Sequence, residues 1–248
     1  MSNIYGLHAV TQFLKTSPEE AKVLYVNGDS PRINEVTALA KRLSIRIERA
    51  TKKEMDERAQ DGNHQGVMLD VADKSIGDEK SLKTFLETLP PNPVILILDS
   101  IQDPHNLGAC LRSAAAFGVN AVVWPKDKQA QLTPVVHKVA SGAVERLNLF
   151  VVTNLSRAME AMQQAGIWIV GTILNDTAKP LSDIDLKGPI AIVMGSEGEG
   201  LRMGTQKQCD FFAYIPMQND IQSLNVSVAT GIALYEVKEQ RSISRRGK

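Results

Sequence analysis

The chain has few cysteines and no long apolar run. Its two cysteines, Cys110 and Cys209, do not form a C-x-x-C pair, and its four histidines are scattered, so we expect neither a disulfide framework nor a metal site. No apolar run approaches the ~20 residues that cross a bilayer. Met1–Val10 also lacks the charged-then-apolar layout of a signal peptide. These absences predict a cytoplasmic protein.

An excess of charge is missing too, because 28 basic side chains are balanced by 28 acidic ones. This balance argues against a protein that coats nucleic acid without specificity. One basic cluster nevertheless lies between positions 41 and 53, where Glu48 is the single acidic residue. Its members are Lys41, Arg42, Arg46, Arg49, Lys52 and Lys53. On charge alone, a solvated helix face explains this basic cluster better than an RNA-binding surface does.

With 248 residues of 43% hydrophobic composition, the chain can form one large domain or two of ordinary size. The first part predicts a small α/β domain, which we place at 1–72. Its strand-like runs and helical spacings alternate along the chain. They lie at Val23–Val26, Asn34–Leu43, Ile45–Ile47, Lys52–Gln60 and Gly66–Val71.

A polar stretch without periodicity and the stiff run Pro90-Pro91-Asn92-Pro93 follow this domain. We therefore expect a linker at 73–92 that contains a short helix at Ser81–Leu89. The second domain is then 93–248.

The second domain opens with Val94–Leu98, an apolar run typical of a strand buried on both faces. The polar segment Asp99–Asn106, predicted as a loop, follows this strand at its carboxyl end. The active-site residues of α/β enzymes usually lie at this end of the strands. The next helix, Gly108–Phe117, carries Arg112 among apolar and small residues. A buried unpaired charge is costly, so Arg112 is either paired, with Asp99 or Asp103, or directed at an anion.

Strands and helices then alternate, which predicts a mostly parallel sheet covered on both faces. The elements lie at Ala121–Trp124, Thr133–Ser141, Leu149–Val152, Ser156–Gln164 and Trp168–Thr172. The next buried strand, Ile190–Met194, ends at the glycine-rich loop Gly195–Gly200. Its three glycines let a ligand approach the backbone. Taken alone, this loop fits an ordinary strand-to-helix turn equally well, because it lacks the spacing of a phosphate-binding or dinucleotide motif.

The last part of the chain predicts a short strand, Phe211–Pro216, a polar loop, Met217–Gln222, and a helix, Val226–Tyr235. We expect Ser223 to cap the free amides at the start of this helix. The small residues of the helix allow another backbone or a ligand to lie against it.

Three segments together resemble the SpoU family of RNA ribose 2′-O-methyltransferases. They read N-x-G-x-x-x-R at 106–112, M-G-S-E-G-E-G-L at 194–201, and I-P-M-x(5)-S-L-N-V-S-V-A-T-G at 215–231. Ile4–Val10 and His64–Val67 resemble the ribosomal-protein-L30e-like RNA-binding domain that often precedes this catalytic domain. We interpret His8 and His64, which lie in these two segments, as packing or capping residues.

The resemblance implies an α/β SPOUT fold, in which the C-terminal segment forms a deep trefoil knot and holds S-adenosyl-L-methionine. It also implies a homodimer through the catalytic domain, and RNA contacts for the basic cluster. Within the family, the chain looks most like bacterial members that methylate a guanosine of 23S ribosomal RNA. The substrate is then 23S ribosomal RNA or a pre-ribosomal particle.

The family motifs also imply roles for single residues. Catalytic roles fall on Asn106, Arg112, Glu197, Ser223 and Asn225, and cofactor contacts on Thr172, Gly195, Ile215, Met217 and Leu224. A guanidinium keeps its proton up to a pKa above ~12, so we interpret Arg112 as a cation that binds a phosphate and stabilises the developing alkoxide. Glu197 is either a general base or an orienting partner, and we favour the second.

One departure from the family is visible, because Asn219 stands where the third motif has Gly. Asn tolerates a left-handed backbone best after Gly, so the departure concerns affinity and not the reaction. Two alternatives stay open: a SpoU enzyme that acts on transfer RNA, and a non-catalytic RNA-binding protein. The separate N-terminal domain argues against the first, and the presence of Asn106 and Arg112 argues against the second.

Overall fold

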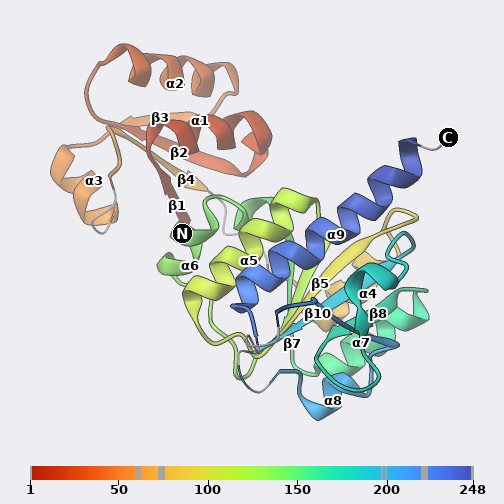
Figure 1. The fold of residues 1–248 in the computed structure, drawn as a ribbon. Coiled ribbons are helices and arrows are strands. Elements are labelled where there is room, and N and C mark those ends of the chain that lie inside the picture. The colour runs from red at the N-terminus through yellow and green to blue at the C-terminus, as the bar shows by residue number, and fades with distance from the viewer. Residues whose placement is uncertain are drawn as a thin grey trace. The chain divides into compact units, whose positions relative to one another are not determined.

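The computed structural model of the protein describes residues 2–59, 63–71, 76–196, 198, 200–218 and 223–246. The chain divides into two compact units, Met1–Lys74 and Ser75–Lys248 (Figure 1). Each unit encloses its own hydrophobic core.

The first unit is built on a four-stranded sheet in the order β1-β4-β2-β3. Its elements are β1 (Ser2–Tyr5), α1 (Leu7–Thr16), β2 (Ala21–Val26), α2 (Pro31–Arg42), β3 (Arg46–Arg49), α3 (Lys52–Ala59) and β4 (Val67–Val71), with a 3-10 turn at Pro18–Glu20. The three predicted strands and two predicted helices are confirmed. The prediction missed β1 and α1, because the four residues of β1 have no alternating pattern and are held by antiparallel pairing with β4.

The strand β4 forms the centre of the first unit, since all five of its side chains are buried. Val67, Leu69 and Val71 pack with α1 and α2 on one face of the sheet, whereas Met68 packs with Met55 of α3. Helices on both faces of one central strand explain why its residues other than Asp70 are apolar, without alternation.

The second unit is built on a seven-stranded sheet in the order β7-β6-β5-β10-β8-β11-β9, in which every pair of neighbours is parallel. The strands are β5 (Val94–Asp99), β6 (Ala121–Pro125), β7 (Asn148–Val152), β8 (Trp168–Thr172), β9 (Lys179–Pro180), β10 (Ile190–Gly195) and β11 (Phe211–Tyr214). The helices are α4 (Glu79–Leu86), α5 (Pro104–Phe117), α6 (Pro134–Ala140), α7 (Leu155–Gln164), α8 (Met203–Gln206) and α9 (Val226–Arg246), with 3-10 turns at Val144–Arg146 and Leu181–Asp183.

Two hydrophobic clusters cover the two faces of this sheet, as the sequence predicts. Helices α5, α6 and α9 pack on one face, and α4 and α7 on the other (Figure 1). Along β5 the side chains alternate between the clusters, with Leu96 and Leu98 on the α5 side and Ile95 and Ile97 on the α7 side. Burial on both faces accounts for the unbroken apolar runs.

The short helix predicted at Ser81–Leu89 exists as α4, and it packs in the second unit. Leu82 and Leu86 are buried against the α7 side of the sheet. Just before the helix, the amide of Gly77 donates to the carbonyl of Leu149 at 2.8 Å, which joins this segment to β7. A Cβ on Gly77 would lie 2.3 Å from the ring of Phe150, so only glycine fits there.

The order of the strands indicates at which edge of the sheet a ligand would bind. From β5 the chain continues through β6 and β7 on one side, whereas β10 and β8 lie on the other side. Ligands of open α/β sheets bind outside the carboxyl ends of the strands at such a reversal of strand order. The carboxyl ends of β5 and β10, where Asp99 and Gly195 are paired in register, mark this point.

Candidate active site

The first motif begins on a helix and not in a loop. Helix α5 starts at Pro104, and the carboxylate of Asp103 accepts from the amide of His105 at 2.8 Å. An Asp followed by Pro is a typical start for a helix. Asn106 therefore lies in the first turn of α5, and the prediction of a loop through Asn106 is wrong.

The third motif begins the last helix, α9. The side-chain oxygen of Asn225 accepts from the amide of Ser227 at 3.0 Å and from its hydroxyl at 2.6 Å. Asn225 thus caps the helix, in place of the predicted Ser223, which is exposed. The side-chain amide of Asn225 also donates to Oδ1 of Asn106 at 2.9 Å. The starts of α5 and α9, and with them the first and third motifs, meet at this bond.

Close packing of α5 makes this meeting possible. A Cβ on Gly108 would lie 2.8 Å from the Cβ of Val139 on α6, so the glycine of the first motif is required by packing. On the α9 side, the thiol of Cys110 lies 3.3 Å from the hydroxyl of Thr230, both buried. The small residues of α9 are therefore used against α5.

The second motif forms a tight loop at the end of β10. Ser196 and Gly200 exchange two backbone hydrogen bonds of 3.1 Å each. A Cβ on Gly195 would lie 2.4 Å from the carbonyl of Gly200, and Gly198 has a φ of 92°, so both positions require glycine. Glu197, predicted to act in catalysis, lies outside the described residues, as does Asn219.

A buried ion pair ties this loop to β5. Asp99 is fully buried, and its carboxylate accepts from Nε of Arg202 at 2.6 Å and from the amide of Arg202 at 3.0 Å. Two charge-assisted hydrogen bonds to one residue fix its position. The sequence prediction missed Arg202, although its place directly after the glycine-rich loop and the aspartate at the end of β5 were available signals.

Arg112 is exposed, so the buried environment inferred from its apolar neighbours is wrong. The buried face of α5 consists of Leu107, Gly108, Cys110, Leu111 and Ala114, and position 112 falls outside it. The structural pairing of Arg112 with Asp99 does not occur, because Asp99 is paired with Arg202.

The predicted cofactor residues lie at the ends of three neighbouring strands. Thr172 ends β8, Gly195 ends β10, and Ile215 follows β11 directly. Because β10, β8 and β11 are adjacent and parallel, the sheet brings these three residues together at one edge. Met217 and Leu224 follow on the way to α9, and both are half-buried. The hydroxyl of Thr172 donates to the carbonyl of Val193 at 2.8 Å, which fixes β8 against β10.

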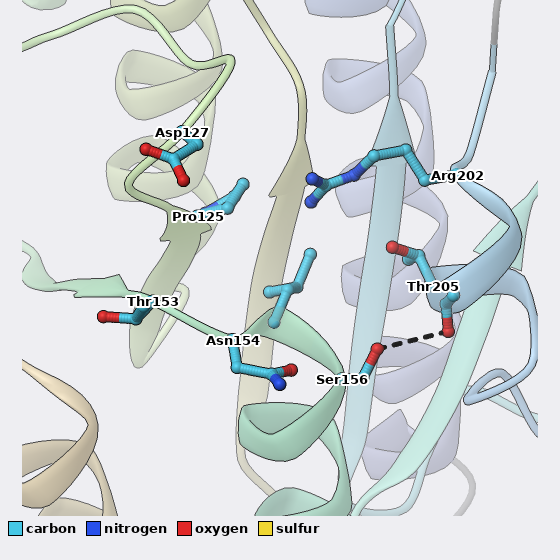
Figure 2. A pocket seen from close by; sticks show the side chains of 9 residues that line it. Pro125, Asp127, Thr153, Asn154, Ser156, Arg202 and Thr205 are labelled. Carbon is cyan, nitrogen blue, oxygen red and sulfur yellow. Dashed lines mark hydrogen bonds between the residues drawn. The ribbon is translucent and has the colours of Figure 1, made fainter.

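The same edge holds a cavity of about 250 Å³ at the ends of β6 and β7 (Figure 2). Its walls include Pro125, Asp127, Asn154, Ser156, Arg202 and Thr205. In Figure 2 the guanidinium of Arg202 points across the cavity toward the side of Pro125 and Asp127. None of these residues was predicted from the sequence, because they come from three separate segments.

In the first unit, all six residues of the basic cluster are exposed. They lie at the end of α2, on β3 and at the start of α3. Two have acidic partners, since Arg49 pairs with Asp29 at 2.8 Å and Arg46 with Glu48 at 2.5 Å. Such exposed pairs are weak, so they leave the cations available to a ligand.

The histidines of the first unit differ in their surroundings. His8 is exposed, whereas His64 is 8% exposed. Nδ1 of His64 accepts from the amide of Gly66 at 3.0 Å, and Nε2 lies 3.0 Å from the carboxylate of Asp56. His64 therefore holds the turn before β4, which is the packing role predicted for it.

Neither cysteine is in a disulfide. Burial raises the pKa of the Cys209 thiol to about 12, with smaller contributions from Asp210 and Asp99. Among the residues that the structure describes, no group of three or more metal-ligating side chains gathers. In the same part of the chain, no helix is long and apolar enough to cross a membrane.

Comparison with known proteins gives the family. Residues 93–235 match the SpoU rRNA Methylase family, and residues 3–77 match a family described as RNA 2′-O ribose methyltransferase substrate binding. The chain belongs to the SpoU rRNA methylase family. The three motifs that meet at the carboxyl edge of the sheet all lie within the first match.

Relatives within the SpoU family are similar along their whole length. The 23S rRNA (guanosine-2'-O-)-methyltransferase RlmB of Pseudomonas putida is 44% identical over 247 residues, covering 99% of each chain. The protein of the same name from Coxiella burnetii is 46% identical over 243 residues, covering 97% of this chain and 96% of that one.

Solved structures of SpoU proteins share the fold. The SpoU methyltransferase AviRb from Streptomyces viridochromogenes, in complex with the cofactor AdoMet, has a TM-score of 0.77 at 21% identity and covers 97% of this chain and 90% of that one. The TrmH/SpoU tRNA modifying enzyme of A. aeolicus has a TM-score of 0.57 at 30% identity, over 67% of this chain and 85% of that one.

Proposed function

We propose that this chain transfers a methyl group from S-adenosyl-L-methionine to the ribose 2′-hydroxyl of a specific guanosine in 23S ribosomal RNA. The observation that carries the proposal is the bond between Asn106 and Asn225, which joins the first and third SpoU motifs beside the loop of the second. Relatives that are 44–46% identical over nearly the whole chain have names that specify this reaction.

The cofactor edge suits this ligand. Ile215, Met217 and Leu224 are apolar side chains that remain only half-buried, so they leave apolar surface that a purine ring can cover. The strand ends at Thr172 and Gly195 present backbone groups beside that surface. These five residues would hold the cofactor, which supplies an electrophilic methyl group when bound.

The chain's own residues position the nucleophile. Asn106 and Asn225 hold each other's amides in a fixed orientation, and with Ser223 they face the ribose hydroxyl in our account. Arg112 has an exposed guanidinium on α5, which is suited to clamp an RNA phosphate next to that hydroxyl and to stabilise the negative charge that develops there. Glu197, from the second motif, is the orienting partner of Arg112. Correct positioning supplies a large part of the acceleration in such a displacement.

The first unit reads the RNA. We assign it to an L30e-like domain at 1–72, joined by a segment at 73–92 to the methyltransferase domain at 93–248. Its match to a substrate-binding family supports this role. The basic cluster supplies phosphate contacts, because its six side chains are exposed on neighbouring elements. This unit also favours ribosomal RNA over transfer RNA, since the likeness to the tRNA modifying enzyme covers only 67% of the chain.

Three further features belong to the proposal. The C-terminal segment forms a deep trefoil knot, which is supported by the insertion of β10 between β5 and β8 and by the return of α9 to α5. The protein acts in the cytoplasm. It is a homodimer through the catalytic unit, because Val228, Ile232 and Tyr235 form an exposed apolar stripe on α9.

Mapping of 2′-O-methyl marks on ribosomal and transfer RNA tests this function. A strain that lacks the gene should lose one guanosine mark in 23S ribosomal RNA and regain it on complementation. Loss of a transfer RNA mark instead would support the transfer RNA alternative. An unchanged set of marks in both RNAs would contradict the proposed function.

A further inference from the structure

The cavity beside Arg202 is polar and lies next to the proposed site of methyl transfer. Asp99, which holds Arg202, ends β5 between the two regions. Gly195 of β10 is paired with Asp99, and Pro125 of the cavity ends the neighbouring strand β6. Adjacent strands are ~4.8 Å apart, so a single nucleoside can extend from the glycine-rich loop into the cavity.

Several polar groups in the cavity have no partner within the described part of the protein. Arg202 uses Nε and its backbone amide for Asp99, whereas its two terminal nitrogens form no hydrogen bond to a described residue. Asp127 is exposed and joins none of the salt bridges between described residues. Thr205 is 2% exposed, yet its hydroxyl makes no hydrogen bond among the described residues. These groups are available to a ligand.

The charges of the cavity exclude a simple anion site. The positive charge of Arg202 is balanced by Asp99 at 2.6 Å, and Asp127 adds a negative charge on the facing wall. A phosphate would therefore meet one compensated cation and one repelling carboxylate. A neutral ligand with acceptors on one side and donors on another fits this arrangement better.

We propose that this cavity receives the base of the target nucleotide and selects guanine. The inference rests on the proposed function, for which it supplies the specificity site. The terminal nitrogens of Arg202 donate to O6 and N7, as arginine does in its commonest base contact. Asp127 accepts from N1–H and the N2 amino group. Among the four bases, only guanine has two adjacent acceptors and two adjacent donors on neighbouring edges.

The other walls suit a base drawn out of its RNA stack. Pro125 and the buried Leu155 supply apolar surface for the ring faces. Bases recognised in this way are unstacked and read by hydrogen bonds on their edges. Arg202 follows the glycine-rich loop closely in the sequence and is held by Asp99. A guanine bound to Arg202 therefore contacts the residue that fixes the end of this loop.

A kinetic comparison of Asp127 variants on two RNAs tests the proposal. The full-length protein and its Asp127→Asn variant are compared in kcat/KM on an RNA that carries the mapped target guanosine. The second RNA has inosine there, which lacks only the N2 amino group. Asp183→Asn, an exposed aspartate of the same unit, is the control variant.

The wild type should prefer guanosine over inosine by roughly tenfold to a hundredfold, the contribution of one hydrogen bond to a charged group. In Asp127→Asn this preference should fall to nearly onefold, mainly because the guanosine RNA becomes slow. Asp183→Asn should retain the full preference, and thermal unfolding should show all three proteins folded.

Equal losses on both RNAs for Asp127→Asn would overturn the proposal, because the carboxylate would then act on the backbone or on the fold. Equal wild-type rates on both RNAs would overturn it as well, while leaving the proposed function intact. A wild type that is inactive on every RNA would contradict the proposed function itself.

Discussion

The side-chain amide of Asn225 donates to the side-chain oxygen of Asn106 at 2.9 Å, across 119 positions of sequence. Asn106 lies in the first turn of α5, which follows β5, and Asn225 caps α9 after the strand β11. One hydrogen bond therefore couples the two helix starts that frame the glycine-rich loop. The bond has consequences for both activity and stability.

Replacing either asparagine should slow methyl transfer, because each fixes the other. We expect Asn106→Ala and Asn225→Ala to lower the single-turnover rate at least tenfold, a loss of about 1.4 kcal/mol. Asn225→Ala should also lower the free energy of unfolding by about 1 kcal/mol, since it removes a helix cap.

A double-mutant cycle checks this coupling. The double variant should be little slower than the slower single variant, because residues in contact do not act additively. Asn148→Ala is the matched control, since its amide bonds the backbone of Asn120 at the opposite end of the strands. Additive losses would show that the two asparagines work independently and would contradict this account.

Arg241 illustrates a cation whose role could not be predicted from the sequence. In the sequence, Arg241 is one of several basic residues between positions 238 and 248, and such residues are usually solvated. In the structure it donates to four backbone carbonyls, those of Leu186, Gly188, Asn92 and Pro93. Burial lowers the pKa of this guanidinium. Arg241 therefore fixes α9 to the starts of β5 and β10.

Arg241→Ala should destabilise the protein by about 2–4 kcal/mol, because three partly buried carbonyls lose a charged donor. Lys238→Ala, on the exposed side of the same helix, should stay within about 0.5 kcal/mol of the wild type. Urea unfolding measures both. If Arg241→Ala unfolds at the wild-type urea concentration and binds RNA more weakly, the residue is an RNA contact and not a structural one.

The sequence predicted the strands well, whereas it misplaced the start of α5 and the cap residue of α9. The strands β5 and β10 are apolar without interruption, so local composition identifies them. The start of α5 depends on whether Asp103-Pro104 caps a helix or forms a turn, and the start of α9 on whether Ser223 or Asn225 is the cap. Both caps are local, Asp103 to the amide of His105 and Asn225 to the amide of Ser227, but the sequence offers a competing local choice at each place.

The exposure of Arg112 and the Asp99–Arg202 pair show the same limit. Neighbouring residues of Arg112 are apolar, but the face to which it belongs depends on where α6 and α9 pack. Asp99 and Arg202 are 103 positions apart, and strand order alone brings them together. Sequence motifs therefore located the functional segments, while their mutual contacts required the fold.

The first unit should supply RNA affinity that depends on salt. Charge reversal of Lys52 and Lys53, both exposed, should weaken RNA binding and reduce the slope of log affinity against log salt by roughly 0.7–0.9 per lost phosphate contact. Binding of S-adenosylmethionine should not change. A double reversal of Lys83 and Lys187, which are exposed in the second unit away from the cavity, provides the control.

A fragment that begins at residue 76 extends this test. It retains α4, which a cut at residue 91 would remove from the core of the second unit. The fragment should bind the cofactor normally and methylate RNA poorly. If it methylates its target as efficiently as the full chain, the first unit is not the RNA reader.

The exposed stripe on α9 should form an isologous dimer interface. Val228, Ile232 and Tyr235 are 51%, 39% and 53% exposed, and they lie on one side of the helix. Light scattering at micromolar concentration should give twice the mass of the chain, and Ile232→Glu should give the mass of one chain. Val135→Glu, an exposed valine on α6, should leave the mass unchanged. A wild-type monomer under these conditions would remove the dimer from the account.

The central claim is that Arg112 acts in the transfer of a methyl group to a guanosine 2′-hydroxyl of 23S ribosomal RNA. The most direct measurement is single-turnover methylation of a 23S transcript by excess full-length protein, with the position of alkali-resistant 2′-O-methylation mapped. Saturating protein separates a slow reaction from weak RNA binding.

The wild type should modify one guanosine. Arg112→Ala and Arg112→Lys should unfold at the wild-type temperature, because the side chain is exposed, and should bind the cofactor. Both should react at least about a hundredfold more slowly, since lysine lacks the planar fork that clamps a phosphate. A near-wild-type rate for Arg112→Lys, or methylation at a base atom in place of the ribose hydroxyl, would contradict the account.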